Sequence, residues 1–175
     1  MRVAALHVWP AGAQVPEPRE ALDLTWLGAE DDRHAGLTML SDSRTTHVYE
    51  RGIEIRNHRQ LSLVSVEELA LIAEQLGLDA PLEPGLIADN IALSGAPTLT
   101  ALPRMTRLEF ASGAVIITGG VNTPCTIAGA MVGQVHGTAP EKFPKAAWDR
   151  RGITGWVDRP GRIAVGDAVT AHPPG

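Results

Sequence analysis

The fold of this chain is decided above all by residues 114–135, which read AVIITGGVNTPCTIAGAMVGQV. The stretch begins with an apolar strand over Ala114–Thr118, and two glycines follow it. Thr or Asn at an N-cap and Pro in the first helical position are the usual start of a helix, so Asn122, Thr123 and Pro124 predict a helix from Pro124 to about Val135. The stretch therefore predicts a strand that turns into a helix, and Gly129 and Gly133 require that helix to be closely packed.

Cys125, the only cysteine of the chain, lies at this predicted helix start. In the first turn, unpaired backbone N–H groups and the positive end of the helix dipole stabilise a thiolate. One cysteine cannot form an intramolecular disulfide, which agrees with a reducing compartment and leaves a thiol free for chemistry. A lone cysteine is also often a small buried packing residue, and the pattern leaves both roles open.

The composition is that of an ordinary globular protein, with 44% hydrophobic and 20% charged residues. At 175 residues the chain fits one domain, residues 1–175. The formal net charge of −5 shows no basic excess, so we expect neither nucleic acid nor an anionic membrane as partner. No apolar run is long enough for a bilayer and no secretory signal is apparent, so we expect a cytoplasmic protein.

Strand signals outnumber helix signals along the rest of the chain. The clearest helix runs from Ser65 to Gly77, where Ser65 and Glu68 have capping-box spacing, and a short helix is expected near Pro144–Arg150. Strands are expected at Val3–Val8, Gln60–Val64, Asn90–Leu93, Thr106–Phe110, Gly152–Val157 and Gly161–Thr170. Short strands with a few inserted helices predict a mixed α/β, β-rich fold, a barrel with helical insertions.

Arginine and histidine side chains are concentrated between residues 33 and 59. They are Arg33, His34, Arg44, His47, Arg51, Arg56, His58 and Arg59. Guanidinium groups around a cleft hold phosphate or carboxylate groups in bidentate fashion, so the cluster predicts a site for a small anion. Taken singly, each of these residues better fits a solvated loop in which arginines pair with neighbouring acids, and the prediction depends on the group.

The order of short motifs along the chain resembles that of the MOSC domain family. These motifs are Asp32-x-His34-x-Gly36, Ser65-x-x-Glu68, Ile87-Ala88-Asp89-Asn90-Ile91, Thr123-Pro124-Cys125, Phe143, Arg151-Gly152 and Gly166-Asp167-x-Val169. MOSC domains form the C-terminal part of molybdenum cofactor sulfurases and occur as small stand-alone bacterial proteins. The resemblance covers residues 34–169 and implies a β-barrel-like fold.

The resemblance also implies a function and a site. A central cysteine, here Cys125, carries persulfide sulfur or contacts the molybdenum of a pterin cofactor, and a basic pocket holds the phosphate of that cofactor. The implied function is sulfur transfer to a metal-sulfur or molybdenum cofactor, or molybdenum-dependent reduction. We expect this pocket to contain Arg33, His34, Arg44, Arg56, His58, Asp89, Asn90, Asn122 and Thr123. Thiolate is the ligand class that soft metals select, which agrees with this role of Cys125.

The chain departs from the family pattern at two positions near the site. Many members have Glu-Asn where this chain has Asp89-Asn90, and many have an arginine where it has Asn122. Arg33, Arg44 or Arg56 would then supply the missing charge. The chain also has no pyridoxal-phosphate domain, so it would need a cysteine desulfurase as partner to obtain sulfane sulfur.

Two other functions remain open from the sequence. The chain could be an independent thiol-dependent transferase or hydrolase that uses Cys125 with a distant histidine. Alternatively, it could be a non-catalytic module that binds a small anionic metabolite or a protein partner, with Cys125 as a packing residue.

Overall fold

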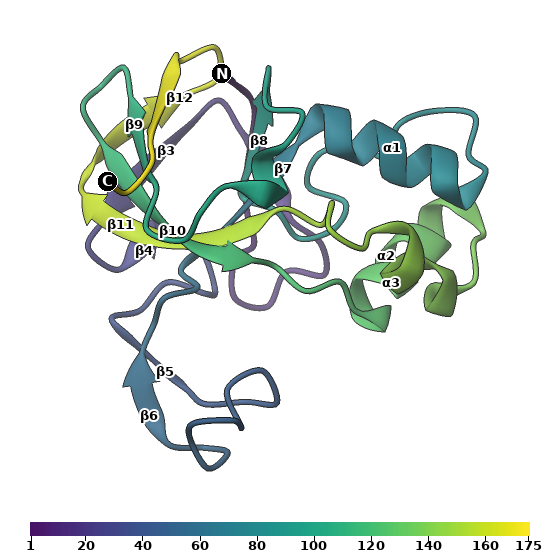
Figure 1. Cartoon of the computed structure of the whole chain (residues 1–175), viewed down its shortest axis with the longest axis horizontal. Coiled ribbons are helices and arrows are strands. Elements are labelled where there is room, and N and C mark those ends of the chain that lie inside the picture. Colours follow the sequence, from purple (N-terminus) through teal and green to yellow (C-terminus); the bar gives the residue numbers. More distant parts are fainter.

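The computed structural model describes residues 1–175 as a strand-rich body that carries helices on one side and an arm below (Figure 1). An eight-stranded sheet forms most of the body, in the order β13-β9-β10-β11-β7-β8-β1-β2. Its strands are β1 (Arg2–Val8), β2 (Glu17–Arg19), β7 (Leu61–Ser65), β8 (Ile91–Ser94), β9 (Arg107–Phe110), β10 (Val115–Val121), β11 (Ile153–Arg159) and β13 (Val169–His172). Five of the six other strands that the sequence predicts are therefore present with β10, and their ends lie within three residues of the predicted ones.

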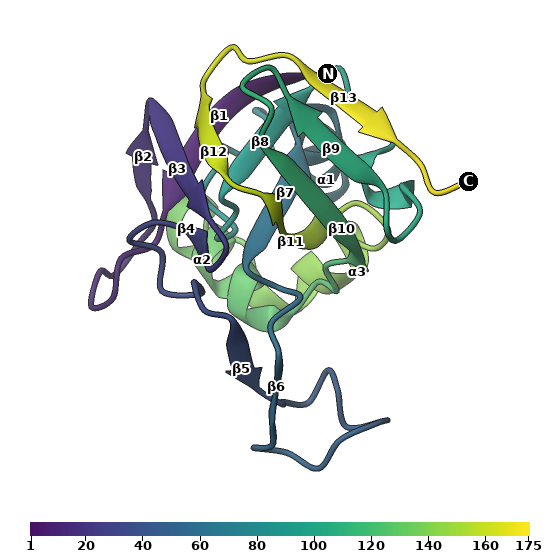
Figure 2. The same cartoon turned by 90° about the vertical axis from the view of Figure 1, so that its left-hand side faces the viewer.

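A second, three-stranded sheet lies against the first in the order β12-β3-β4. Its strands are β3 (Ala21–Thr25), β4 (Gly28–Ala29) and β12 (Gly161–Ala164). The expected single strand over Gly161–Thr170 is wrong, because a turn at Gly166 divides it into β12 and β13 and sends the halves to different sheets (Figure 2).

The fold is mixed α/β and β-rich as predicted, but the sheet of the expected barrel does not close. The eight-stranded sheet has free ends at β13 and β2, and its pairing does not run around a closed ring. An isolated bridge between Arg2 and Ala168, together with backbone hydrogen bonds of Met1 and Val3, brings β1 close to the start of β13.

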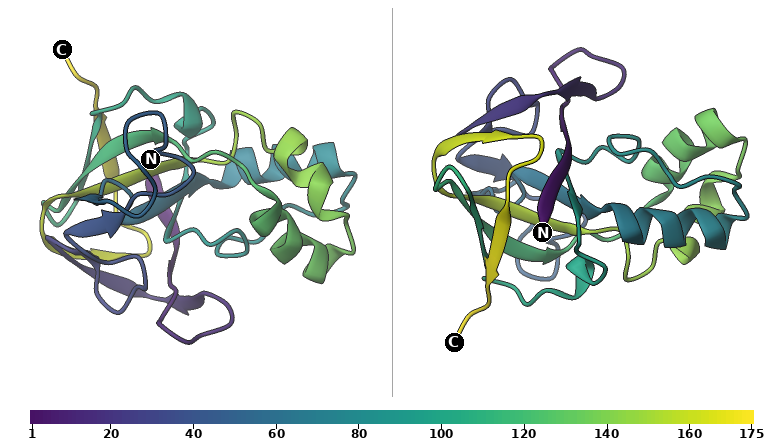
Figure 3. Two further views of the ribbon diagram at one scale, coloured as in Figure 1. Left: turned by 90° about the horizontal axis from the view of Figure 1, so that it is seen from below. Right: turned by 90° about the horizontal axis from the view of Figure 1, so that it is seen from above.

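The helices lie together at one end of the body (Figure 3). They are α1 (Val66–Leu76), α2 (Thr126–His136) and α3 (Phe143–Ala146), with two 3-10 turns, η1 (Leu99–Ala101) and η2 (Pro140–Lys142). The third helix is shorter than expected and begins at Phe143. No helix of the chain combines the length and the apolar character that a membrane span requires.

Helix α1 connects β7 to β8, the one parallel pair of the sheet. Its ends follow from local chemistry: the Ser65 side chain accepts from the backbone N–H of Glu68, and Gly77 closes the helix in a left-handed conformation. Only half of the capping box forms, because the Glu68 carboxylate turns to Thr100 and accepts from its N–H and hydroxyl.

Two apolar cores follow from the alternation of side chains along β7. Leu61 and Leu63 point into a core enclosed by the two sheets, whereas Val64 points the other way, into a core beneath the helices. The second core joins Ile72 of α1 and Val132 of α2 to the back of the sheet. The helices thus hold the segment before α2 against the ends of β7 and β8.

The arm is the β5–β6 hairpin with its loop, residues 38–56, and it projects away from the body (Figures 1 and 2). Strands β5 (Thr38–Leu40) and β6 (Glu54–Arg56) pair antiparallel, and the Ser41 hydroxyl ties the loop by donating to the Glu50 carbonyl. Neither core contains an arm residue. The arm therefore folds on its own hydrogen bonds beside the body.

Candidate functional site

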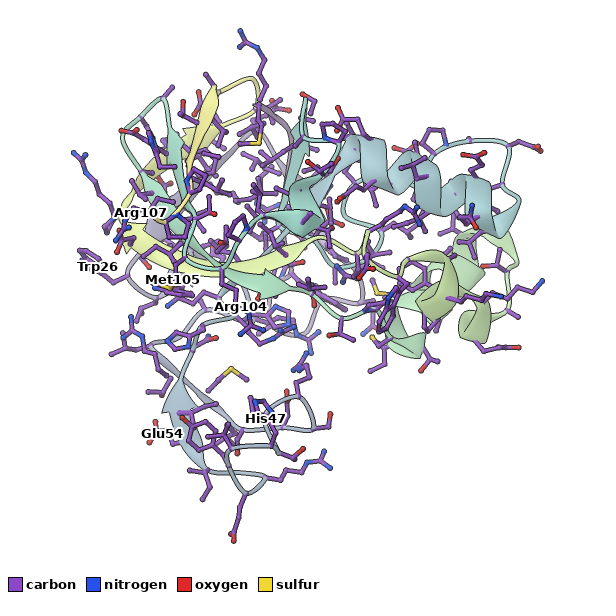
Figure 4. The ribbon with its side chains drawn as sticks, viewed as in Figure 1. Trp26, His47, Glu54, Arg104, Met105 and Arg107 are labelled. Atoms are coloured by element: carbon purple, nitrogen blue, oxygen red, sulfur yellow. The ribbon has the colours of Figure 1, made fainter.

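A cavity of about 860 Å³ lies between the arm, the ends of the central strands and α2. The arm contributes Thr38, Met39, Asp42, Ser43, Arg44 and Arg51 to its wall. The segment before β7 and the loops that flank β8 and β10 supply polar groups, and Ile127 and Met131 of α2 supply apolar surface. Figure 4 shows the side chains that fill the space between arm and body, with His47 and Glu54 on the arm. The cavity therefore has a polar floor and one apolar wall.

Positive charge dominates this cavity. Five arginines line it and only one carboxylate, and these residues are Arg33, Arg44, Arg51, Arg59, Arg151 and Asp42. The contrast with the formal net charge of −5 for the chain is sharp. A concave surface with one sign of charge concentrates ligands of the opposite sign, so the cavity fits a small anion.

Asp42 does not neutralise the positive charge of the whole cavity, because it is paired with Arg44. The Arg44 side chain donates to both Asp42 oxygens, and these hydrogen bonds lower the pKa of Asp42 to about 2 and raise the pKa of Arg44. Burial lowers the pKa of Arg59 to about 10, and the nearby Arg44 contributes to this shift. All of these groups are ionised at neutral pH, which leaves Arg59 and Arg151 as charges without a carboxylate hydrogen-bonded to them.

Cys125 is exposed and lines the cavity. It is the N-cap of α2 rather than a residue of the first turn, so the expected helix start at Pro124 is wrong by two residues. Cys125 itself is extended, Pro124 lies before it outside the helix, and no side-chain hydrogen bond caps the helix. The negative charge of a Cys125 thiolate raises the pKa values of Arg44, Arg59 and Arg151. This effect is smaller than that of the Asp42 hydrogen bond on Arg44 and smaller than that of burial on Arg59 and Arg151. These three arginines and Cys125 line the same cavity.

Gly129 and Gly133 explain how α2 reaches this position. A Cβ on Gly129 would lie 2.2 Å from the carbonyl oxygen of Pro140, and one on Gly133 would lie 2.5 Å from that of Thr138. These contacts bear out the prediction that the helix needs close packing. The two glycines let the following chain fold back against α2.

A continuous hydrogen-bonded chain forms the floor of the cavity. It runs through the side chains of His34, Asp32 and Asn90 to the backbone N–H of Ser62, and from the Ser62 hydroxyl to the side chains of Asn122 and Arg59. Asn90 is buried and joins the two halves: its amide donates to Asp32 (2.8 Å) and to the His7 carbonyl, and its oxygen accepts from the Ser62 N–H (2.9 Å). Both amide hydrogens of Asn90 are thus used within the protein, which suits a residue that positions its neighbours.

Asn122 forms the other end of this chain, three residues before Cys125. Its amide donates to the Ser62 hydroxyl (3.0 Å), and its oxygen accepts from Arg59 (2.9 Å). Asn122 stands where many family members have an arginine, and Arg59 brings a guanidinium to the same place from the segment before β7. Arg151 reaches the Ser62 hydroxyl from the opposite side.

Most of the residues expected in the pocket line this cavity. They are Arg33, His34, Arg44, Asn90, Asn122, Thr123 and Cys125. Arg33 also lies over the Trp9 ring, with its guanidinium carbon 4.5 Å from the ring centroid. The lining thus joins residues from four separate parts of the sequence.

Three expected residues lie outside the lining: Arg56, His58 and Asp89. Arg56 is exposed at the end of β6, and the ring of His58 packs on Trp156 at a centroid distance of 4.7 Å. Asp89 is buried behind the cavity, where both of its oxygens accept from the Gly85 N–H. The sequence shows that such residues lie close together along the chain, but it does not show which way each side chain points from its strand or loop.

Arg59 and Arg151 are the residues that sequence reasoning passed over. Arg59 belongs to the basic stretch and Arg151 to a family motif, so both had a signal, but neither stood out from its neighbours. The buried Arg151 donates to the Ile87 carbonyl, and its Nε atom has no partner in the protein. An orphaned, buried guanidinium nitrogen beside the cavity is a further indication that an anion belongs there.

The chain is similar to known proteins over nearly its whole length. Residues 39–170 match the model of the MOSC domain. YuaD of Bacillus subtilis (strain 168), whose name assigns it to metal-sulfur cluster biosynthesis, is 34% identical over 174 residues, which are 98% of this chain and 90% of YuaD. The crystal structure of YuaD matches with a TM-score of 0.93 and 32% identity, and the match covers 99% of this chain and 96% of that one.

More distant structures share the fold. The crystal structure of YiiM from Geobacillus stearothermophilus has a TM-score of 0.64 at 15% identity, and the match covers 98% of this chain and 74% of YiiM. That of YiiM from Escherichia coli has a TM-score of 0.56 at 16% identity, with 98% and 71% covered.

Proposed function

Because this chain belongs to the MOSC domain family, we propose that it acts in sulfur transfer for metal-sulfur chemistry, with Cys125 as the thiol that carries sulfane sulfur. One observation carries the proposal: an exposed, unpaired cysteine lies in a cavity lined by five arginines and one carboxylate. The name of YuaD, a relative that matches nearly the whole chain, supports the same kind of role.

The proposed loading step is an exchange of one sulfur atom. The Cys125 thiolate attacks the terminal sulfur of a donor persulfide, the sulfur–sulfur bond of the donor breaks, and the donor leaves as a thiolate. Cys125 then holds the terminal sulfur and its proton as a persulfide. The chain carries no group that would generate sulfane sulfur, so the donor is a separate persulfide, such as that of a cysteine desulfurase.

The arginines have two tasks in this step. Arg44, Arg59 and Arg151 line the same cavity as Cys125 and attract the negative charge that develops on its sulfur. The arginines that have no carboxylate hydrogen-bonded to them also bind the anionic part of a second substrate. Burial of Arg59 and Arg151 strengthens both effects, because the local dielectric is lower than in water.

Molybdenum cofactor fits the same cavity by the chemistry of the groups present. Arg59 and Arg151 would hold its phosphate, and the Cys125 sulfur is a soft ligand suited to molybdenum. No cluster of three or more histidine, cysteine or acidic side chains is arranged to hold a metal ion. Cys125, the only cysteine, is the one thiolate ligand that the chain offers to molybdenum. When bound, the cofactor would supply a redox-active metal centre.

Intact-mass measurement after incubation with inorganic polysulfide tests the proposal. We expect the purified chain to gain one sulfur atom that a reducing agent removes, and we expect Cys125→Ala to gain none. Loss of the signal in the variant at unchanged melting temperature assigns the sulfur to Cys125. A wild-type chain that retains no sulfur would refute sulfur carriage.

Metal and pterin analysis tests the cofactor separately. The chain is purified from a host that makes molybdenum cofactor, beside the Cys125→Ala variant. We expect pterin and molybdenum with the wild-type chain, and less molybdenum with the variant. Polysulfide loading without any pterin would identify a sulfur carrier alone. Pterin and molybdenum without loading would identify a cofactor protein.

A further inference from the structure

His34 and Asp32 form an oriented pair at the wall of the cavity. The Nδ1 atom of His34 is 3.0 Å from Oδ1 of Asp32, and the same carboxylate oxygen accepts from the His34 backbone N–H at 2.8 Å. The side chain of Asp32 has no exposure, whereas that of His34 is half exposed. A buried carboxylate thus holds one nitrogen of the ring, and the other side of the ring faces the space that His34 lines.

The surroundings of Asp32 keep it ionised. Burial opposes ionisation, but hydrogen bonds from His34 and Trp9 outweigh it and lower the pKa of Asp32. Asn90 donates to the second oxygen at 2.8 Å, beside the Trp9 N–H, also at 2.8 Å. An ionised carboxylate accepts hydrogen bonds only, so it fixes the His34 tautomer with the proton on Nδ1.

The consequence is a free lone pair on Nε2. No protein group hydrogen-bonds to this nitrogen. A histidine held by a buried aspartate through Nδ1, with Nε2 open to a cavity, is the arrangement in which imidazole serves as a general base. The Trp9 ring meets the imidazole edge-on at 6.4 Å and limits its rotation.

The same cavity contains Cys125, whose persulfide a deprotonated acceptor would attack. His34 and Cys125 both line it, and the hydrogen-bonded floor runs from Asp32 through Asn90 to Asn122, three residues before the cysteine. This floor fixes the histidine and the cysteine loop relative to each other. The pair is therefore built into the site rather than left on a solvated loop.

We propose that His34 is the general base for the unloading of Cys125: it accepts the proton of the nucleophile that takes sulfane sulfur from the Cys125 persulfide. This inference rests on the proposed function. The acceptor nucleophile bonds to the terminal sulfur, the sulfur–sulfur bond breaks, Cys125 leaves as a thiolate, and the acceptor's proton moves to Nε2 of His34. Asp32 is the positioning residue, and its negative charge stabilises the imidazolium that results.

The test compares two acceptors of different protonation. Cys125 is loaded with polysulfide, and sulfane sulfur is then transferred either to glutathione, whose thiol must lose a proton, or to sulfite, which has no proton on the attacking sulfur. For His34→Ala we expect transfer to glutathione to slow by about a hundredfold or more, and transfer to sulfite to change little. Added imidazole should restore part of the glutathione rate, because it replaces the missing base.

Two further variants complete the design. Asp32→Asn leaves the ring in place but allows the wrong tautomer, so it should slow the glutathione reaction selectively; its fold is checked by circular dichroism. His47→Ala changes an exposed histidine on the arm outside the cavity lining and should behave as wild type. Equal slowing of both acceptors in His34→Ala, or no slowing, would overturn the role of His34 and leave sulfur carriage standing. A wild-type chain that takes no sulfur would overturn both proposals.

Discussion

Arg59 shows at the level of a single residue how this chain builds a cationic site. It is partly buried, donates to Asn122 at 2.9 Å and has no carboxylate as hydrogen-bond partner. Burying a guanidinium without a carboxylate hydrogen-bonded to it is costly, so we expect an anion from solvent to stabilise its position. Arg44 differs, because Asp42 already accepts from it.

Replacing Arg59 with methionine tests this view directly. We expect inorganic phosphate to bind about ten- to a hundredfold more weakly, the loss of one charge-assisted hydrogen bond. The difference between the variant and the wild type should shrink as salt is added, because salt screens the attraction. Titration calorimetry at low and high salt measures it, with Arg56→Met as the control outside the cavity. Equal affinity in both variants would move the anion site away from Arg59.

Asn90 is the residue on which the polar floor depends, and two substitutions separate its charge from its hydrogen bonds. Asn90→Ala removes the bonds to Asp32 and Ser62 and should lower the free energy of unfolding by about 1–3 kcal/mol. Asn90→Asp places a second carboxylate beside the buried Asp32, and we expect a loss of about 3 kcal/mol or more at neutral pH.

The pH dependence distinguishes the two Asn90 variants. Repulsion between two carboxylates this close raises the pKa of one of them. As the pH falls, that carboxylate takes up a proton and the repulsion disappears. Urea unfolding should show Asn90→Asp regaining stability on acidification relative to Asn90→Ala. A constant gap between the two curves would mean that the carboxylates have moved apart.

At the scale of elements, the sequence is informative where the chemistry is local. Ser65 and Gly77 predict both ends of α1, because a cap depends on residues three or four positions away. The expected start of α2 at Pro124 is two residues too early, because a proline fits either an extended segment or the first turn of a helix. Strands β5 and β6 were missed because most of their side chains are exposed and show no apolar alternation. Convergence of Arg59 and Arg151 on one thiol is a tertiary property, and no spacing in the sequence encodes it.

The packing of α2 provides a prediction at this scale. Ala is a better helix former than Gly by about 1 kcal/mol, yet we expect Gly129→Ala to destabilise the protein by about 1–3 kcal/mol. The reason is the carbonyl of Pro140, 2.2 Å from the position of the new Cβ. Thermal unfolding measures the effect, and Gln134→Ala, an exposed position of the same helix, serves as the control. A more stable Gly129→Ala variant would show that η2 moves away without cost.

Glu68 links α1 to η1 and should make stability depend on pH. Burial raises the pKa of Glu68 above its usual value, although hydrogen bonds from Thr100 oppose this shift. The folded protein therefore binds this proton more tightly than the unfolded chain does. The resulting contribution is fully present below the unfolded pKa, near 4.5, and is lost as the pH rises through the folded value.

The variant Glu68→Gln cannot titrate and should lack this dependence. Urea unfolding across the acidic range should show the wild type losing stability relative to Glu68→Gln as the pH rises from about 4.5. The comparison is made as a difference between the two proteins, so that other titrating groups cancel. A difference that does not vary with pH would mean that Glu68 keeps its ordinary pKa.

At the scale of the whole molecule, stability and charge are assigned to different parts. The two apolar cores lie within the body, whereas the arm supplies Arg44 and Arg51 to the cavity and no residue to either core. The hydrogen bond from the Asn57 N–H to the Leu37 carbonyl closes the base of the arm, outside residues 38–56. The body should therefore fold without the arm, and the site should not be complete without it.

Replacement of residues 38–56 by a short glycine-serine linker tests this division. We expect one cooperative thermal transition within about 2–4 °C of the wild type, a change of no more than about 1 kcal/mol, because no core contact is lost and a shorter loop costs less entropy to close. Phosphate affinity should fall, since two of the five cavity arginines leave with the arm. The double variant Arg44→Met/Arg51→Met is the matched control, as it removes the same charges and keeps the hairpin. Equal losses of affinity in the two proteins would assign the arm's role to its charges, whereas a further loss in the shortened chain would show that the arm also shapes the cavity; a broad or lost transition would make the arm part of the folding unit and contradict the division.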